Sequence, residues 1–275
     1  MPTQQNTRRW FGWLRQGNFK TFYLLGLPVI RRKTKPSLEL LMRELVFIKQ
    51  LYIPASVRHP EIFGKYKACH RGQDVVIVAT GPTLDDYTPI PGAIHIGVNR
   101  AFQANHVPLD YLFAIDDLKV PVETLADYRP DACKKFIGHN ISREGLVNMA
   151  PEYMLEACNA QRFYYEPATV FHSWQRIPID IACVPLMVYE SVITAAFQFA
   201  LWTRPRRIYL VGCDCSNAGY FKQEKSEVPQ FLRTGPLGQA WGIMKTFAER
   251  VYPDVEIISI NPVGLKGLFT DKYTK

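Results

Sequence analysis

The apolar residues of this chain gather into short, nearly continuous runs that are separated by longer amphipathic or polar intervals. Six runs read as buried strands and cover residues 75–79, 93–98, 111–115, 135–138, 208–212 and 255–260. Strands that are apolar on both faces are typical of a parallel sheet with helices packed on each side. The pattern therefore predicts an α/β fold with a mostly parallel sheet flanked by helices.

Three intervals carry the residue spacing of helices. Residues 190–202 and 236–251 each precede a predicted strand. A third helix is expected over residues 36–52, where Ser37 can cap the first turn and the apolar residues Leu41, Leu45, Ile48 and Leu51 follow helical spacing. We expect this apolar face to dock on the main domain. The prolines of residues 54–60 are expected to end the helix and to open a linker.

At 275 residues the chain fits one large domain with appendages better than two full domains. We expect residues 1–60 to form a basic, aromatic and helical N-terminal extension, and residues 61–275 to form the main domain. Within the main domain, residues 139–185 are irregular and rich in aromatic residues, which predicts a lid-like insertion over a cleft. His172 in this insertion is either a candidate general base or a structural histidine beside aromatic rings.

The formal net charge of +8 is distributed unevenly. Residues 1–35 contain eight bases and no acidic residue, so the rest of the chain is formally neutral. A neutral body disfavours groove-wide nucleic-acid binding. Residues 8–35 interleave these bases with Trp, Phe, Tyr and Leu, a composition that suits the headgroup region of an anionic membrane. The alternative is that the aromatic residues of this tail pack against their own domain.

The cellular location follows from two further features of the sequence. No apolar run reaches the roughly 20 residues that a membrane-spanning helix needs. The six cysteines are scattered and form no C-x-x-C pair, which favours reduced thiols of a cytosolic protein over a disulfide framework. We therefore expect a cytoplasmic protein that lies peripherally on the inner face of the cytoplasmic membrane.

Candidate chemistry lies where predicted strands end. In parallel α/β sheets, ligands bind beyond the carboxyl ends of the strands, and polar or flexible residues follow four strands there. A glycine permits a tight turn with amides facing an anion, an Asn-Arg pair suits a nucleotide or sugar, and a carboxylate can bind a ribose hydroxyl, a divalent cation or an acceptor hydroxyl. Turn residues and helix caps are the plain structural alternatives. The residues are Thr80, Gly81, Pro82 and Thr83; Asn99 and Arg100; Asp116 and Asp117; and Gly212 with Asp214.

Five segments together resemble a Rossmann-like group of enzymes. The group includes bacterial sialyltransferases that act on lipooligosaccharide, motility-accessory-factor glycosyltransferases and archaeal hydroxymethylpterin diphosphokinases. The segments are VIVATGPTL (76–84), GVNR (97–100), YLFAID (111–116), SVITAAFQFA (191–200) and RIYLVGCD (207–214), and the closing NPVGLKG (261–267) is similar too. The resemblance implies a Rossmann-like domain in residues 61–275 that binds a nucleotide or nucleotide sugar.

The resemblance also implies roles for individual residues. In the sialyltransferases a Gly-x-Gly-Pro-Ser-Leu loop and an Asn after the second strand bind the CMP part of the donor. Gly81, Pro82, Thr83 and Asn99 match these positions, and Ser191 and Thr194 lie in the matching helix segment. Ala79 replaces the first glycine of the loop, and Thr80 stands where an Asn is usual.

A second departure concerns the general base. The sialyltransferases use a histidine downstream of the Gly-x-Asp strand, whereas this chain has no histidine after Asp214. A carboxylate can also deprotonate an acceptor hydroxyl. Asp116, Asp117, Asp214 and His172 therefore all stay open as the base.

The front end carries its own likeness. FYLLGLPVIRRK (residues 22–33) resembles the opening of many bacterial lipopolysaccharide and capsule glycosyltransferases. Together the resemblances imply a glycosyltransferase that moves a sugar from a nucleotide sugar onto a glycan or lipid-linked acceptor of the bacterial surface. The resemblance to sialyltransferases favours a sialic-acid-like sugar on a CMP-linked donor. They assign no metal ligands, and a divalent metal stays open.

Two other readings of the sequence stay open. The first is a pterin-type diphosphokinase in which Asp116, Asp117 and Asp214 gather Mg²⁺ around ATP. The second is a non-catalytic homologue that binds a glycan or a partner protein. The absence of a histidine after Asp214 keeps this second reading alive.

Overall fold

The computed structural model describes residues 11–16, 19–24, 27–33, 38–115, 122–141, 147–148, 151–216, 218–221 and 234–274. The chain divides into two compact units, residues 1–46 and 47–275. The first unit contains an antiparallel three-stranded sheet and most of helix α1. Its elements are β1 (Phe11–Gln16), β2 (Phe19–Leu24), β3 (Leu27–Lys33) and α1 (Leu38–Phe47).

The basic aromatic segment is therefore built of strands rather than of helix. We expected a helical extension, but residues 11–16, 19–24 and 27–33 pair as β1–β2–β3, and the described part of helix α1 begins at Leu38. Aromatic and β-branched side chains, which are frequent in this segment, favour strands. Within the described residues, no helix combines the length and the apolar content that a membrane span needs.

The expected helix break at residues 54–60 is wrong. Helix α1 is followed by a π-helical turn, η1 (Ile48–Tyr52), and then by α2 (Ile53–Phe63), in which Pro60 lies inside the helix. The amide of Ile53 donates to the carbonyl of Ile48, five residues back. In a π turn the hydrogen bonds run to the carbonyl five residues back, so the usual bond to the carbonyl four residues back is already absent. Pro54, which has no N–H to donate, therefore costs little in the first turn of α2.

The apolar face of this helix differs from the expectation as well. Leu51 is fully buried, but Leu41, Leu45 and Ile48 are exposed. Phe47, Leu51 and Ala55 are the buried positions instead, and they form a small cluster with Tyr164.

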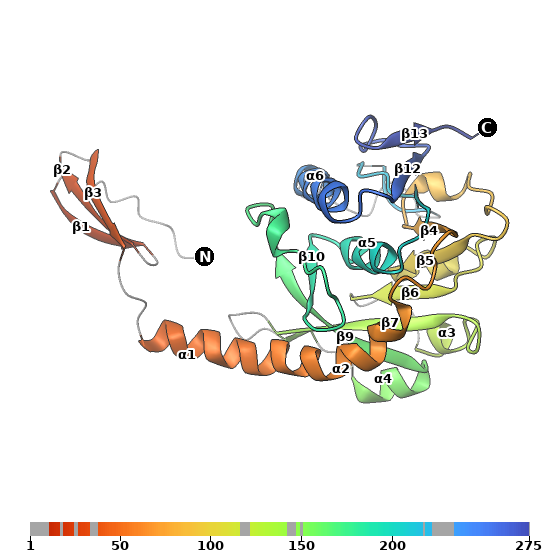
Figure 1. The fold of residues 1–275 in the computed structure, drawn as a ribbon, viewed down its shortest axis with the longest axis horizontal. Helices are drawn as coiled ribbons and strands as arrows, with labels where there is room; N and C mark the ends of the chain where they lie inside the picture. Colours follow the sequence, from red (N-terminus) through yellow and green to blue (C-terminus); the bar gives the residue numbers. More distant parts are fainter. Residues whose placement is uncertain are drawn as a thin grey trace. The chain divides into compact units, whose positions relative to one another are not determined.

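The second unit is built on a parallel sheet (Figure 1). Among the described residues, nine strands pair in the order β10-β9-β7-β6-β5-β4-β11-β12-β13, and every pair in this path is parallel. The short β8 (Val147–Asn148) pairs antiparallel with β7. The nine strands are β4 (Asp74–Val78), β5 (Ile94–Val98), β6 (Tyr111–Ala114), β7 (Lys134–Ile141), β9 (Ala160–Ala168), β10 (Leu186–Tyr189), β11 (Arg207–Val211), β12 (Glu256–Ile260) and β13 (Thr270–Lys272).

Helices cover both faces of this sheet, and each face has its own core. One core includes the end of α2, all of α5 and part of α6; the other includes side chains of α3, α4 and the turn η4. Every residue of α5 is buried. The predicted Rossmann-like α/β fold is thus confirmed. The remaining helices and turns are η2 (Gly64–Tyr66), η3 (Pro82–Leu84), η4 (Asn99–Gln103), α3 (Val122–Ala126), α4 (Glu152–Ala157), η5 (Trp174–Arg176), α5 (Ile193–Trp202) and α6 (Thr234–Val251).

The stretch interpreted as a lid contributes to the sheet itself. Residues 160–168 form β9, which pairs with β7 on one side and with β10 on the other. The strand escaped notice because its apolar stretch, Phe163–Tyr165, is only three residues long and is flanked by the charged residues Arg162 and Glu166. Residues 169–185 lead from the carboxyl end of β9 to the start of β10, and they contain His172 and η5.

His59 ties α2 to the edge of the sheet. Its Nδ1 lies 2.9 Å from the carbonyl oxygen of Ile181 and 3.0 Å from that of Val184, and its Nε2 accepts from the amide of Tyr164 at 2.9 Å. These partners require a neutral ring with the proton on Nδ1, because a proton on Nε2 would face the Tyr164 N–H. Burial lowers the pKa of His59 from 6.5 to about 4.

This histidine predicts an acid-sensitive contribution to stability. Between pH 6.5 and about 4 the unfolded chain binds a proton that the folded chain refuses, so the free energy of unfolding falls as the pH drops through this window. We expect His59→Gln to flatten the difference between pH 7 and pH 4.5 by on the order of 2 kcal/mol in urea unfolding. His106→Gln, at an exposed histidine, is the control. Equal pH dependence in the wild type and His59→Gln would contradict the assignment.

Candidate functional site

The strand order reverses between β4 and β11. From β4 the chain adds β5, β6, β7, β9 and β10 toward one edge, and it then returns to place β11, β12 and β13 on the other side of β4. Such a reversal leaves a crevice at the carboxyl ends of the two central strands, and ligands of open α/β sheets bind there. The loops after β4 and β11, which hold Gly81 and Gly212, both begin at this point.

The two loops are joined backbone to backbone. The amide of Ala79 donates to the carbonyl of Val211 and the amide of Gly81 to that of Gly212, each at 2.8 Å. Neither glycine has room for a side chain: a Cβ on Gly81 would overlap the Asp214 carboxylate, and one on Gly212 would lie 2.8 Å from the carbonyl oxygen of Ala79. Gly212 also has a φ of +63°, which favours glycine. Close approach therefore explains both glycines.

Asp214 fastens the β4 loop. Its buried carboxylate accepts a hydrogen bond from the amide of Thr83 at 3.0 Å and another from the hydroxyl of the same residue. Charged acceptors make stronger hydrogen bonds than neutral ones, and this one is shielded from water. As the structure stands, Asp214 holds Thr83 in place rather than facing an open cleft.

The turn after β4 is short, and its amides are already used. Pro82–Leu84 form a single 3-10 turn. The amides of Gly81, Thr83 and Leu84 donate to Gly212, Asp214 and Gly81 respectively. The sequence suggested that this loop presents free N–H groups to an anion, but these three groups donate within the protein. Thr80, Pro82 and Thr83 are partly exposed and provide the accessible surface of the loop.

Asn99 and Arg100 lie at the end of the neighbouring strand. Asn99 directly follows β5, has a φ of +46°, and accepts a 3.4 Å hydrogen bond from the amide of Ile115 through its Oδ1. The guanidinium of Arg100 lies 5.5 Å from the ring centroid of Tyr220. The next residue, Phe221, donates its amide to the carbonyl of Thr80 at 2.9 Å. Residues 220 and 221 thus join Arg100 to the β4 loop, a link that the sequence did not reveal.

A second supporting segment comes from the closing motif. The amide of Gly264 donates to the carbonyl of Asp214 at 2.7 Å, and a Cβ on Gly264 would overlap the carbonyl oxygen of Cys215. The NPVGLKG segment therefore packs beneath the Asp214 turn. The motif could be recognised in the sequence, but its contact with the Asp214 turn could not be predicted from it.

Of the other predicted site residues, some lie apart from this group and two are not among the residues that the structure describes. Asp116 and Asp117 directly follow Ile115 and are not among the described residues. His172 accepts from the amide of Thr169 at 3.0 Å through Nδ1, in the turn after β9. Thr194 is fully buried and bonds to the backbone of Tyr189 and Ser191, so Ser191 and Thr194 shape the β10–α5 turn. That turn lies five strands from β4, roughly 24 Å across the sheet.

The thiols beside Asp214 stay protonated at neutral pH. Burial raises the pKa of Cys213, and burial raises that of Cys215 to about 12. Within the described part of the chain, no group of three or more His, Cys, Asp or Glu side chains is placed to hold a metal ion.

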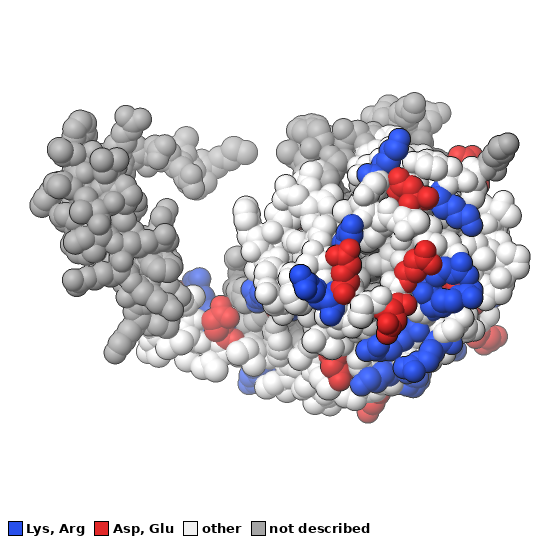
Figure 2. Space-filling view, turned by 45° about the horizontal axis from the view of Figure 1, so that its top comes forward, with Lys and Arg blue, Asp and Glu red and all other residues white. Residues whose placement is uncertain are grey.

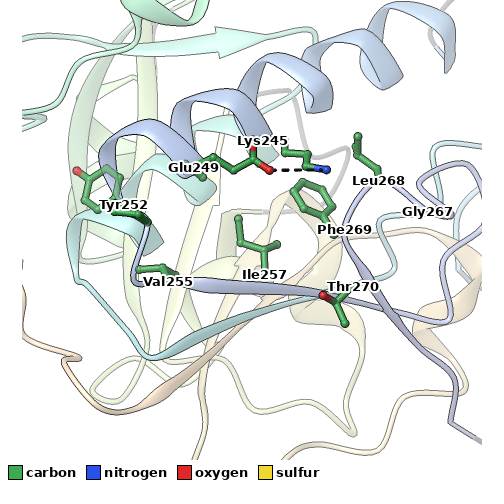
Figure 3. A pocket seen from close by; sticks show the side chains of 11 residues that line it. Lys245, Glu249, Tyr252, Val255, Ile257, Gly267, Leu268, Phe269 and Thr270 are labelled. Atoms are coloured by element: carbon green, nitrogen blue, oxygen red, sulfur yellow. Dashed lines mark ion pairs between the residues drawn. The ribbon is translucent and has the colours of Figure 1, made fainter.

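Two cavities lie elsewhere in the second unit. One, of about 320 Å³, is lined by α6, the segment before β12 and the segment before β13; Lys245 and Glu249 form a 3.7 Å ion pair at its edge (Figure 3). The other, of about 400 Å³, is lined by α2, α4 and the start of β9. Both open at the amino ends of their strands, away from Gly81 and Asn99. Where Figure 2 shows one face of the protein, acidic side chains lie among the basic ones.

A scan against protein-family models found no match for this chain, and a search of curated proteins found none either.

The Asp214–Thr83 contact makes a prediction about stability. Thr83→Val removes the hydroxyl donor and leaves part of a buried carboxylate unpaired, so we expect the free energy of unfolding to fall by about 2 kcal/mol. Thr83→Ser keeps the donor and should cost less than half as much. Urea unfolding of both variants measures the difference. An unchanged free energy of unfolding in Thr83→Val would contradict the assigned role of the hydrogen bond.

Proposed function

We propose that this protein is a glycosyltransferase that uses a nucleotide sugar, with a CMP-linked donor favoured, and that acts on a bacterial surface glycan or a lipid-linked precursor of one. The observation that carries the proposal is the crevice between β4 and β11. There a glycine loop, fixed by Asp214, lies beside an Asn-Arg pair at the next strand end. Nucleotides bind at such reversals in open α/β sheets.

The residues divide into supporting and contacting groups in this proposal. Asp214, Gly81 and Gly212 fix the shape of the loop, and they act through it. Thr80, Pro82 and Thr83 provide its accessible surface, with Asn99 and Arg100 beside it. A guanidinium is suited to phosphate, and an amide is suited to the polar edge of a base or sugar. Asp116 and Asp117 follow β6 in the sequence and remain candidates for contact with the sugar or the acceptor.

A diphosphokinase reading needs Asp214 to share a magnesium ion with Asp116 and Asp117. The carboxylate of Asp214 already accepts two hydrogen bonds from Thr83, which leaves it less suited to bind a cation. This contact favours the glycosyltransferase over the kinase.

Ligand binding tests the proposal directly. We expect CMP at 100 times its dissociation constant to stabilise the protein by about 2.7 kcal/mol, visible as a rise in Tm, and we expect a CMP-linked sugar to be hydrolysed slowly. Asn99→Gly keeps the left-handed backbone of this position but loses the amide, so it should weaken CMP binding. Asn261→Gly is the matched control, because Asn261 also directly follows a strand and has a φ of +48°. Stabilisation by ATP with Mg²⁺ but not by CMP would refute the proposal in favour of the kinase. Binding of CMP without hydrolysis of the donor would instead favour a non-catalytic homologue.

We further propose that residues 8–35 bind an anionic membrane surface, which would keep the enzyme near lipid-linked acceptors on the inner face of the cytoplasmic membrane. Eight bases and no acid lie in the first 35 residues. The first turns of α1 add exposed apolar side chains: Leu38 is 76% exposed and Leu45 is 59% exposed. Apolar side chains beside bases are the composition of interfacial membrane segments.

Vesicle binding tests the membrane proposal. Each base near an anionic leaflet contributes about 1 kcal/mol, so replacing Arg31, Arg32 and Lys33 by Ser should weaken binding to phosphatidylglycerol vesicles on the order of 100-fold in co-sedimentation. The control replaces three exposed bases of the second unit, Lys65, Arg71 and Lys134. If both triple variants lose binding equally, net charge and not the N-terminal segment is responsible.

A further inference from the structure

We infer that His139, at the tip of β7, is the base that takes the proton from the acceptor hydroxyl. The inference rests on the proposed glycosyl transfer. It assigns the base to a strand end that sequence reasoning passed over, because the apolar run was read as ending at Gly138.

The register of the sheet extends the tip of β7 past the end of its neighbour β6. Ala114, the last residue of β6, pairs with Ile137, so His139 and Asn140 lie beyond the carboxyl end of β6. On the other side β7 stays paired, with His139 beside Tyr164 of β9. The tip of β7 therefore forms a wall at the carboxyl side of the sheet, on the side of β6 away from β5.

A short chain of contacts links this wall to the proposed donor site. Gly138 lies so close to Ile115 that a Cβ would come within 2.5 Å of the Ile115 side chain. The amide of Ile115 in turn donates to the Oδ1 of Asn99. Ile115 thus links the strand end that carries Asn99 to the strand end that carries His139. A sugar that extends from a nucleotide held at Asn99 would have its reactive carbon in this region.

Both side chains are buried polar groups without hydrogen bonds in the described part of the chain. His139 is 7% exposed and Asn140 is 8% exposed. The Nδ1 of His139 and the Oδ1 of Asn140 are buried and find no partner among the described residues. An unpaired buried polar group costs about 1–3 kcal/mol, and native proteins rarely keep two in succession without a use for them.

The surroundings of His139 suit a base. The ring of Tyr164 contacts it edge to face at a centroid distance of 5.2 Å and so restricts its orientation. Burial and the nearby charge of Arg162 lower the pKa of His139. The ring is therefore neutral at pH 7, with a lone pair available for a proton.

The acceptor hydroxyl oxygen forms a bond to the anomeric carbon of the donor sugar while its proton passes to His139. The bond between the anomeric carbon and the phosphate oxygen breaks, and its electron pair leaves with CMP. With water in place of the acceptor, the same step hydrolyses the donor to free sugar and CMP.

Donor hydrolysis by the full-length protein tests the assignment, with CMP-N-acetylneuraminic acid as the probe. We expect His139→Gln to lower kcat by about 10²–10⁴-fold while KM and the CMP-induced rise in Tm stay unchanged. Imidazole should restore part of the rate to His139→Ala, whose side-chain space it can fill. His70→Gln is the matched control, because His70 is also buried but bonds to Tyr111 and Gln73 at the amino side of the sheet.

Each outcome decides the matter. Unchanged hydrolysis in His139→Gln overturns the assignment and leaves the proposed glycosyl transfer intact. Loss of the CMP-induced shift together with hydrolysis, or loss of hydrolysis with no response to imidazole, shows a structural histidine and also overturns it. A wild-type protein that neither binds CMP nor hydrolyses the donor overturns the proposed function, and the assignment falls with it.

Discussion

The site depends on one buried carboxylate. The side chain of Asp214 is buried and needs hydrogen-bond donors there, and the β4 loop provides them through the amide and hydroxyl of Thr83. Meeting this requirement draws the loops after β4 and β11 together until only glycines fit at positions 81 and 212. The shape of the crevice thus follows from the hydrogen bonds that the buried Asp214 carboxylate requires. The two glycines follow from the close approach of the loops that these bonds impose.

The sheet was predictable because its central strands carry a strong local signal. Strands β4, β5, β6, β11 and β12 are short apolar runs, and each lies within a residue or two of its predicted position. A strand that is buried on both faces needs apolar side chains at every position. This pattern can be recognised in the sequence without knowing which strands pair with it. The same reasoning missed β9, whose apolar stretch is only three residues long between two charged residues, and it ended the N-terminal helix at prolines that a preceding π turn tolerates.

The candidate site was only partly predictable, for a different reason. Residue types at strand ends indicate where a cleft lies, but hydrogen bonds decide which groups remain available in it. In the sequence Asp214 is a candidate for the chemistry, but in the fold it holds Thr83 in place. His139 looks like the end of a strand in the sequence, but its buried Nδ1 finds no hydrogen-bond partner among the described residues. The link of Tyr220 and Phe221 to Arg100 and Thr80 depends on tertiary contact, which no local pattern encodes.

The order of the strands also determines when the crevice can exist during synthesis. Thr83 and Asp214 are 131 residues apart, and β4 pairs with β11 along its whole length. Until the ribosome has released the second half of the chain, one edge of β4 has no neighbouring strand. The backbone N–H and C=O groups of Val75–Val78 on that edge are then unpaired, and the side chains beside them are apolar. Such an apolar edge is a template for association with other chains. The protein is therefore most vulnerable to aggregation as a nascent chain, and the strand that completes the crevice also closes that edge.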